Sequence, residues 1–122
     1  MRFFNRSIFG LFLTVLTIGV LLAAVYVFKN AQSRASFEIW ISILKRVDWN
    51  EPSNIILTYN SADILGKGSN RVVFNIGGNK YRMICKYHFG ETKAHLFVKW
   101  IGTHAEYTKL CKSGMQYEIS GY

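Results

Sequence analysis

Cysteines and acidic residues are both scarce in this sequence. It has two cysteines in 122 residues, and seven acidic residues against fifteen lysines and arginines. Two cysteines, one of them (Cys85) inside an apolar strand-like pattern, exclude a disulfide framework and fit a reducing cytosol. The shortage of acids leaves a formal net charge of +8 at pH 7. A small domain with this surplus typically meets a polyanion, either nucleic acid or an anionic membrane surface, although a charge excess that only improves solubility gives the same total.

Charged residues are absent from residues 8–28, IFGLFLTVLTIGVLLAAVYVF. This run is about as long as the ~20 apolar residues that a membrane-spanning helix needs, but its flanks are basic on both sides and give no orientation. Four interpretations stay open for residues 1–29: a transmembrane helix, a signal peptide, a buried core helix, or a segment added by a misassigned start codon. We therefore divide the chain into an apolar N-terminal segment, residues 1–29, and a domain, residues 30–122, whose twelve basic and seven acidic residues give +5.

Neither repeats nor low-complexity segments divide that domain, and its patterns predict an α+β fold with N-terminal helices packed on a small antiparallel sheet. A helix is predicted over residues 33–49, with Ser33 or Ser36 as its cap. Its apolar positions recur at helical spacing and are Phe37, Trp40, Ile41, Leu44 and Val47. The single proline, Pro52, suits the first turn of a short helix at residues 52–58.

The second half of the domain predicts strands. Residues 60–70 are rich in turn-forming residues and are expected to be a loop. Strands are expected at residues 71–76, 80–88 and 95–101, with a short final strand at 115–122. Gly77 and Gly78 supply the positive φ values of a tight hairpin turn, and residues 89–94 form the next turn.

Alternation along these strands collects basic side chains on one face of the sheet. If the opposite face packs on the helices, the free face presents Arg71, Asn75, Arg82, Lys86 and Lys99. Leu96, Val98 and Trp100 are then expected together on the face that Lys99 does not share. No acidic residue falls on the basic face in any of the three strands, whereas an ordinary solvated face mixes charges of both signs. The pattern favours a surface for a polyanion over a merely solvated face.

A histidine and a tyrosine stand three residues apart where the last long strand ends, in WIGTHAEYTKL at residues 100–110. If this segment turns helical, His104 and Tyr107 share one face of the helix. Such a pair could hold a substrate, move a proton, or simply close a core. His88 and His95 have no spacing that indicates a metal site, so neither a metal nor a cofactor is predicted.

Two stretches, NRVVFNIGGNKYR and GTHAEY, stand together in an order that resembles the HigB family of bacterial type II toxins. The resemblance covers residues 30–110, with a looser match in AQSRASFEIWISILKRVDWNEPSNI. It implies a RelE/ParE-like fold and a ribosome-dependent mRNA interferase, an endoribonuclease that needs no metal and inhibits translation. Such enzymes are thought to let a ribose 2′-hydroxyl attack the adjacent phosphate.

The resemblance also implies roles for particular residues. Arg82 and Lys86 would grip the scissile phosphate and its neighbour, because they lie about 13 Å apart along a strand, roughly two nucleotides of backbone. His104 would carry a proton, and Tyr107 would stack on a base or donate a proton. The remaining predicted RNA contacts are Arg71, Asn75, Lys80 and Lys99.

The expected partners are mRNA on the ribosome and a helix-turn-helix antitoxin resembling HigA. A ribosome-directed domain must face the cytoplasm, with anchoring to the inner membrane through residues 8–28 as an alternative. Two other functions stay open at this stage: a non-catalytic or gyrase-targeting ParE-like module of the same fold, and a membrane-tethered RNA-binding protein without cleavage.

Overall fold

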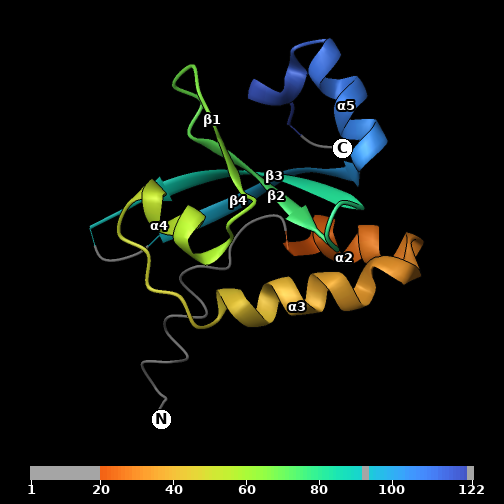
Figure 1. Cartoon of the computed structure of the whole chain (residues 1–122), viewed down its shortest axis with the longest axis horizontal. Coiled ribbons are helices and arrows are strands. Elements are labelled where there is room, and N and C mark those ends of the chain that lie inside the picture. The colour runs from red at the N-terminus through yellow and green to blue at the C-terminus, as the bar shows by residue number, and fades with distance from the viewer. Residues whose placement is uncertain (1–19, 92–93, 121–122) are drawn as a thin grey trace.

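The computed structural model describes residues 20–91 and 94–120, and Figure 1 shows how its helices and strands are arranged. The helices in the first half are α2 (Val20–Lys29), a 3₁₀ turn η1 (Ala31–Ser33), α3 (Arg34–Leu44) and α4 (Pro52–Thr58). Four strands follow: β1 (Asp63–Leu65), β2 (Arg71–Ile76), β3 (Tyr81–Phe89) and β4 (Ala94–Thr103). The described chain ends with α5 (His104–Lys112) and a second 3₁₀ turn, η2 (Met115–Tyr117). The predicted α+β class is confirmed.

The four strands form one antiparallel sheet in the order β1-β2-β3-β4. Ile76 pairs with Tyr81 across the predicted hairpin turn, where Gly77 and Gly78 have φ values of 67° and 66°. The prediction that residues 60–70 are only a loop is wrong, because Asp63–Leu65 pair with β2. Three residues are too few to show the alternation by which a strand is recognised in a sequence.

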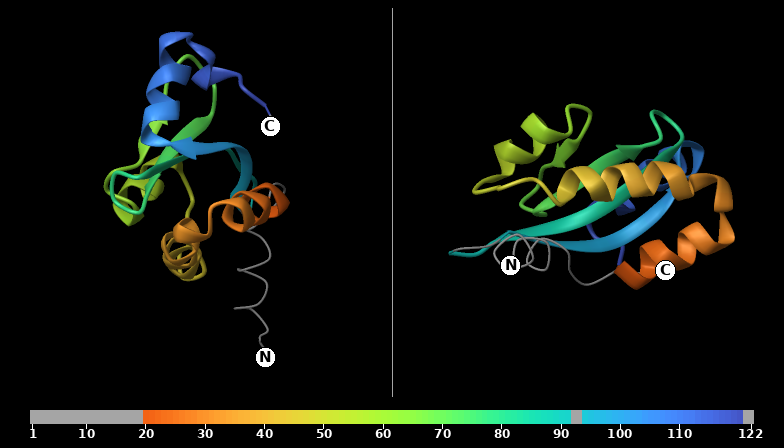
Figure 2. Two further views of the ribbon diagram at one scale, coloured as in Figure 1. Left: turned by 90° about the vertical axis from the view of Figure 1, so that its right-hand side faces the viewer. Right: turned by 90° about the horizontal axis from the view of Figure 1, so that it is seen from below.

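Helices α2 and α3 lie on one side of the sheet and α5 on the other, as the side view in Figure 2 shows. We call the side with α2 and α3 the core face and the side with α5 the outer face. The core face buries its side chains against the predicted apolar stripe of α3, of which Phe37, Trp40 and Leu44 are buried. Helix α4 has the predicted bounds, whereas α3 ends at Leu44 instead of residue 49. The chain leaves the helix there and places Trp49 in the core, where its indole N–H donates to Thr58 Oγ1 at 2.9 Å.

Helix α2 continues the apolar N-terminal run, of which residues 8–19 lie outside the described residues. Its Tyr26 packs against the core, with ring centroids 6.1 Å from Phe37 and 6.2 Å from Tyr81. In residues 20–91 and 94–120, no helix has both the length and the apolar character that crossing a membrane requires. The division of the chain at residue 30 stays a prediction, but α2 contributes packing to the domain that follows it.

Strand β4 contains one residue more than β3 over the stretch in which the two strands pair. Cys85 pairs with Val98, but the preceding Ile84 pairs with Trp100, so Lys99 is the extra residue of a β-bulge. The bulge reverses the alternation, and Trp100 therefore packs beside Ile84 on the outer face. The prediction that Trp100 shares a face with Leu96 and Val98 is wrong for this reason.

The predicted final strand at 115–122 is also wrong. Gly114 has φ of 73°, and the chain turns there into η2 instead of extending along the sheet. Residues 115–120 return towards β2, where Arg71 Nη1 donates to the carbonyl oxygens of Ile119 at 2.7 Å and Gln116 at 3.3 Å. Residues 121 and 122 lie outside the described residues.

Candidate functional site

The outer face of the sheet is covered over only part of its area. A second hydrophobic cluster joins the buried Leu65, Val73 and Ile84 to side chains of β4, α5 and the C-terminal turn: Trp100, Tyr107, Leu110, Tyr117 and Ile119. The predicted free face is therefore free at one end and closed at the other. Alternation along the strands did not predict this cover, because α5 carries few apolar residues. Its half-buried side chains pack against residues of the sheet that are distant in sequence.

Arg82 lies at the closed end and is only 7% exposed. Its Nη2 donates to Asn79 Oδ1 at 2.7 Å, and its Nη1 donates to the carbonyl oxygen of Tyr81 at 3.1 Å. The prediction that Arg82 stands on the solvent face is wrong. A buried guanidinium with hydrogen bonds to neutral oxygens keeps its charge and directs a positive potential at whatever lies above it.

Arg71, on the neighbouring strand, is 5% exposed and bonds to the C-terminal segment as described above. Burial lowers the pKa of its guanidinium, and the negative charge of Glu118 opposes that change. Its predicted place on a free face is wrong, because the segment carrying η2 covers it.

The GTHAEY stretch forms the start of α5 through a capping box. Thr103 Oγ1 accepts from the backbone N–H of Glu106 at 3.1 Å, and Glu106 Oε1 accepts from the backbone N–H of Thr103 at 2.7 Å. Gly102 makes room for this arrangement, since a Cβ there would lie 2.4 Å from the Trp100 ring and 2.8 Å from Glu106 Oε1. His104, the first residue of the helix, is exposed, and its backbone N–H donates to the carbonyl oxygen of Lys80 at 3.0 Å.

Tyr107 follows one helical turn later, with its ring centroid 6.2 Å from that of Trp100. Burial is the main cause that raises the pKa of its phenol, followed by a hydrogen bond with the Cys111 side chain. The charge of Asp63 raises the pKa further, and the charge of Arg82 acts in the opposite direction. Tyr107 is thus a neutral phenol at physiological pH that lies within electrostatic reach of Arg82.

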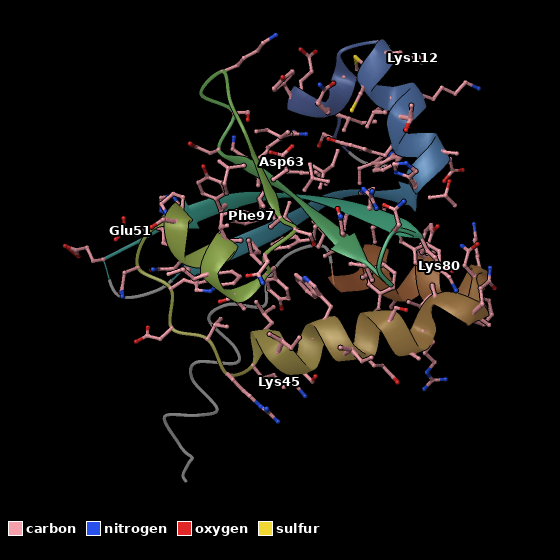
Figure 3. All side chains as sticks on the ribbon, in the orientation of Figure 1. Lys45, Glu51, Asp63, Lys80, Phe97 and Lys112 are labelled. Atoms are coloured by element: carbon pink, nitrogen blue, oxygen red, sulfur yellow. The ribbon has the colours of Figure 1, made fainter. Side chains whose placement is uncertain are left out.

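Seven of the eight predicted site residues separate into two groups, and Lys99 belongs to neither. Lys80, Arg82, His104 and Tyr107 gather where the β2–β3 hairpin meets the start of α5, and Asn75 pairs with Arg82 across the strands. Lys86 lies four residues further along β3, about 13 Å away, next to Arg71 on β2. Lys99 occupies the bulge of β4. In Figure 3, Lys80 lies at the end of the sheet where α5 begins, and Phe97, the cross-strand partner of Lys86, lies towards the other end.

Sequence reasoning missed three side chains beside Lys86. Phe97 pairs with Lys86, and His88 pairs with His95, which places all four on the outer face at its open end. The signal was present in the predicted turn at residues 89–94, because two residues at similar distances from a hairpin turn face each other. In the part of the chain that the structure describes, no three His, Cys, Asp or Glu side chains gather as a metal would require.

The sequence matches one protein family over residues 33–110, which is more than half of the chain. That family is described as the HigB toxin, the RelE-like toxic component of a toxin–antitoxin system. No curated protein matches the chain. The matched range begins with the last residue of η1, contains the whole sheet and ends within α5, so both stretches that form the closed end of the outer face lie inside it. The chain belongs to the HigB family of toxins.

Proposed function

We propose that this toxin is an endoribonuclease that cleaves mRNA on the ribosome and thereby inhibits translation. The observation that carries the proposal is the group of Arg82, His104 and Tyr107 at one end of the outer face, where Asp63 on β1 is the only acidic residue of the four strands. Strands β2, β3 and β4 contain no acidic residue at all. An RNA strand that lies across this face meets positive charges, hydrogen-bond donors and a histidine. Strands β2, β3 and β4 present no negatively charged side chain that would repel its phosphates.

The cluster supplies the groups that the reaction needs. A base takes the proton of the ribose 2′-hydroxyl as its oxygen attacks the adjacent phosphorus, the bond from phosphorus to the 5′-oxygen breaks, and an acid gives a proton to that leaving oxygen. His104 is exposed and has the chemistry to take or give a proton near neutral pH. Tyr107 is a neutral phenol near neutral pH and can therefore donate a proton to the leaving oxygen, although its raised pKa makes it a weak acid. Arg82 stabilises the growing charge on the phosphate from below the surface.

A pair of variants on one helix tests the role of His104. We expect His104→Gln to lower cleavage on translating ribosomes by about 10²–10⁴-fold, because a general acid or base is removed. Lys109→Gln, at another exposed position of α5, is the matched control and should cleave normally. Cleavage is read by mapping mRNA ends after induction in cells. Intact messages together with DNA damage would show action on gyrase and contradict the proposal.

Arg82 needs a gentler substitution because it is buried. Arg82→Lys keeps the charge but loses the paired geometry with Asn79 and Tyr81, and we expect a rate loss of about 10²–10³-fold. The melting temperature, measured on the same sample, must stay close to that of the wild type for the loss to be assigned to catalysis. A stable variant with full toxicity would remove Arg82 from the site.

A cognate antitoxin follows from family membership, and we propose that it is a helix-turn-helix protein resembling HigA and encoded beside the toxin. A predominantly basic outer face in a domain of net charge +5 must be silenced in a living host. Co-expression should restore growth, and the complex should co-purify. Failure of both with the neighbouring gene would contradict the proposed antitoxin. Because the proposed substrate is mRNA on the ribosome, we propose that the toxin domain acts in the cytoplasm.

A further inference from the structure

The open end of the outer face carries a set of rings that the proposed reaction does not use. We define it as the His88–Phe97 patch, made of Lys86 and His88 on β3 with His95 and Phe97 on β4. Lys86 and His88 are exposed, and His95 and Phe97 are half-buried. Neither hydrophobic cluster of the described residues includes Phe97. An aromatic ring that lies on a sheet and belongs to no hydrophobic cluster can contact a ligand or another molecule.

The rings are arranged in a way that suits flat partners. The centroids of His95 and Phe97 are 6.4 Å apart and their planes differ by only 12°. The centroid of His88 is 6.0 Å from that of His95. Consecutive bases of a nucleic-acid strand are also nearly parallel and rise by about 3.4 Å, so 6.4 Å is close to two such steps. The rings of His95 and Phe97 therefore offer a base two stacking surfaces of nearly the same orientation.

Charge adds a second reason for the same ligand. Lys86 pairs with Phe97 directly, so its side chain leaves the sheet beside the rings and can reach the phosphate of a stacked nucleotide. Single-stranded nucleic acid is bound by this combination of aromatic platforms and a basic track. A paired base has no free face to offer, which excludes a duplex as the natural ligand.

We infer that the His88–Phe97 patch binds an unpaired base of the RNA strand, which stacks on Phe97 and His95 while Lys86 neutralises its phosphate. This inference rests on the proposed function, because it assigns the patch to the substrate strand. Lys86 lies about 13 Å from Arg82 along β3, so the stacked base belongs to a nucleotide roughly two positions from the cleaved bond. The patch holds the strand in register, and the closed end performs the chemistry.

The test measures binding of a labelled single-stranded RNA octamer to the full chain by fluorescence polarisation. Phe97→Leu keeps an apolar side chain but removes the ring, and we expect affinity to fall about 5- to 150-fold. Phe28→Leu is the matched control, because Phe28 is 88% exposed on α2, and it should bind as the wild type. Lys86→Gln, at an exposed position, should reduce the slope of log affinity against log salt by about one. A 2-aminopurine base in the octamer should lose fluorescence on binding, and less so with Phe97→Leu.

The outcomes separate this inference from the proposed function. His104→Gln should bind the octamer normally while cleaving poorly. If the wild type cleaves mRNA but Phe97→Leu binds and cleaves equally well, the patch is not a stacking site and the ribonuclease proposal stands. If the wild type binds the octamer through Phe97 but never cleaves, the patch stands and the ribonuclease proposal fails. Equal affinity for a duplex of the same sequence would overturn the stacking inference.

Discussion

The two faces of the sheet use the same strands for different purposes. On the core face, Trp40, Tyr59 and Phe74 interlock, with centroids 5.1 Å apart for Trp40–Phe74 and 5.2 Å for Tyr59–Phe74. The Tyr59 hydroxyl donates to the carbonyl oxygen of Trp40 at 2.7 Å. The outer face has a smaller cluster with two arginines buried at its margins. The core face is built mainly from apolar and aromatic contacts, whereas the outer face holds both buried arginines, Arg71 and Arg82, whose charge can attract a negatively charged ligand.

The largest expected difference between the two faces is in cysteine reactivity, because Cys85 lies on the core face and Cys111 lies on α5, which covers the outer face. Cys85 is fully buried on the core face, and burial raises the pKa of its thiol. Cys111 is half-buried on α5. We expect iodoacetamide to alkylate Cys85 at least about 10³-fold more slowly than Cys111, because Cys85 reacts only after global unfolding. Mass spectrometry of the native protein reads both rates, and a denatured sample in which both react is the control. Equal rates in the native protein would mean that the core face opens locally.

Removing one ring from the core face should cost the most stability. Phe74 is 0% exposed and contacts two aromatic rings, so Phe74→Ala should lower the free energy of unfolding by about 3–5 kcal/mol. Phe28→Ala, at an exposed position, should change it by less than about 0.5 kcal/mol. Urea titration followed by fluorescence measures both. A loss below about 1 kcal/mol for Phe74→Ala would show that the core repacks around the missing ring.

The core face was largely predictable from the sequence, because it depends on periodicity alone. The stripe of α3, the bounds of α4 and the glycine turn at Gly77 and Gly78 are each set by neighbours in sequence. The outer face was not, because it depends on contacts between distant residues. Nothing near Arg71 in sequence indicates that Ile119 accepts its hydrogen bond.

The candidate site shows the same division at the level of single residues. The sequence placed His104 and Tyr107 on one face only on the condition that the segment is helical, and α5, which begins at His104, meets that condition. The burial of Arg82 was not predicted, since it depends on the docking of α5. The β-bulge at Lys99 was not predicted either, although this one extra residue moves Trp100 from one face of the sheet to the other.

Gly102 tests how tightly the closed end of the outer face is fitted. A Cβ there would meet the Trp100 ring at 2.4 Å, and the ring is held between β4 and Tyr107. We expect Gly102→Ala to lower the free energy of unfolding by about 1–3 kcal/mol, because the indole must leave its position. The double variant Gly102→Ala/Trp100→Ala removes the clash with the ring and leaves only the contact with Glu106 Oε1, so the cost of Gly102→Ala should be smaller in that background. An undiminished cost there would place the strain at Glu106 in the capping box and not at the ring.

Arg71 offers the finest comparison, between a buried and an exposed contact to the same C-terminal segment. Arg71→Met removes the donor shared by the carbonyl oxygens of Ile119 and Gln116, and we expect a loss of about 1–2 kcal/mol because those acceptors stay half-buried without it. Lys67 lies 4.6 Å above the Tyr117 ring at an exposed position, and Lys67→Met should cost only about 0.5 kcal/mol. Thermal melts rank the two, and limited proteolysis reports whether residues after Gly114 are released. If the two substitutions cost the same, the buried guanidinium of Arg71 would contribute no more stability than a surface contact, and the closure of the outer face would not depend on it.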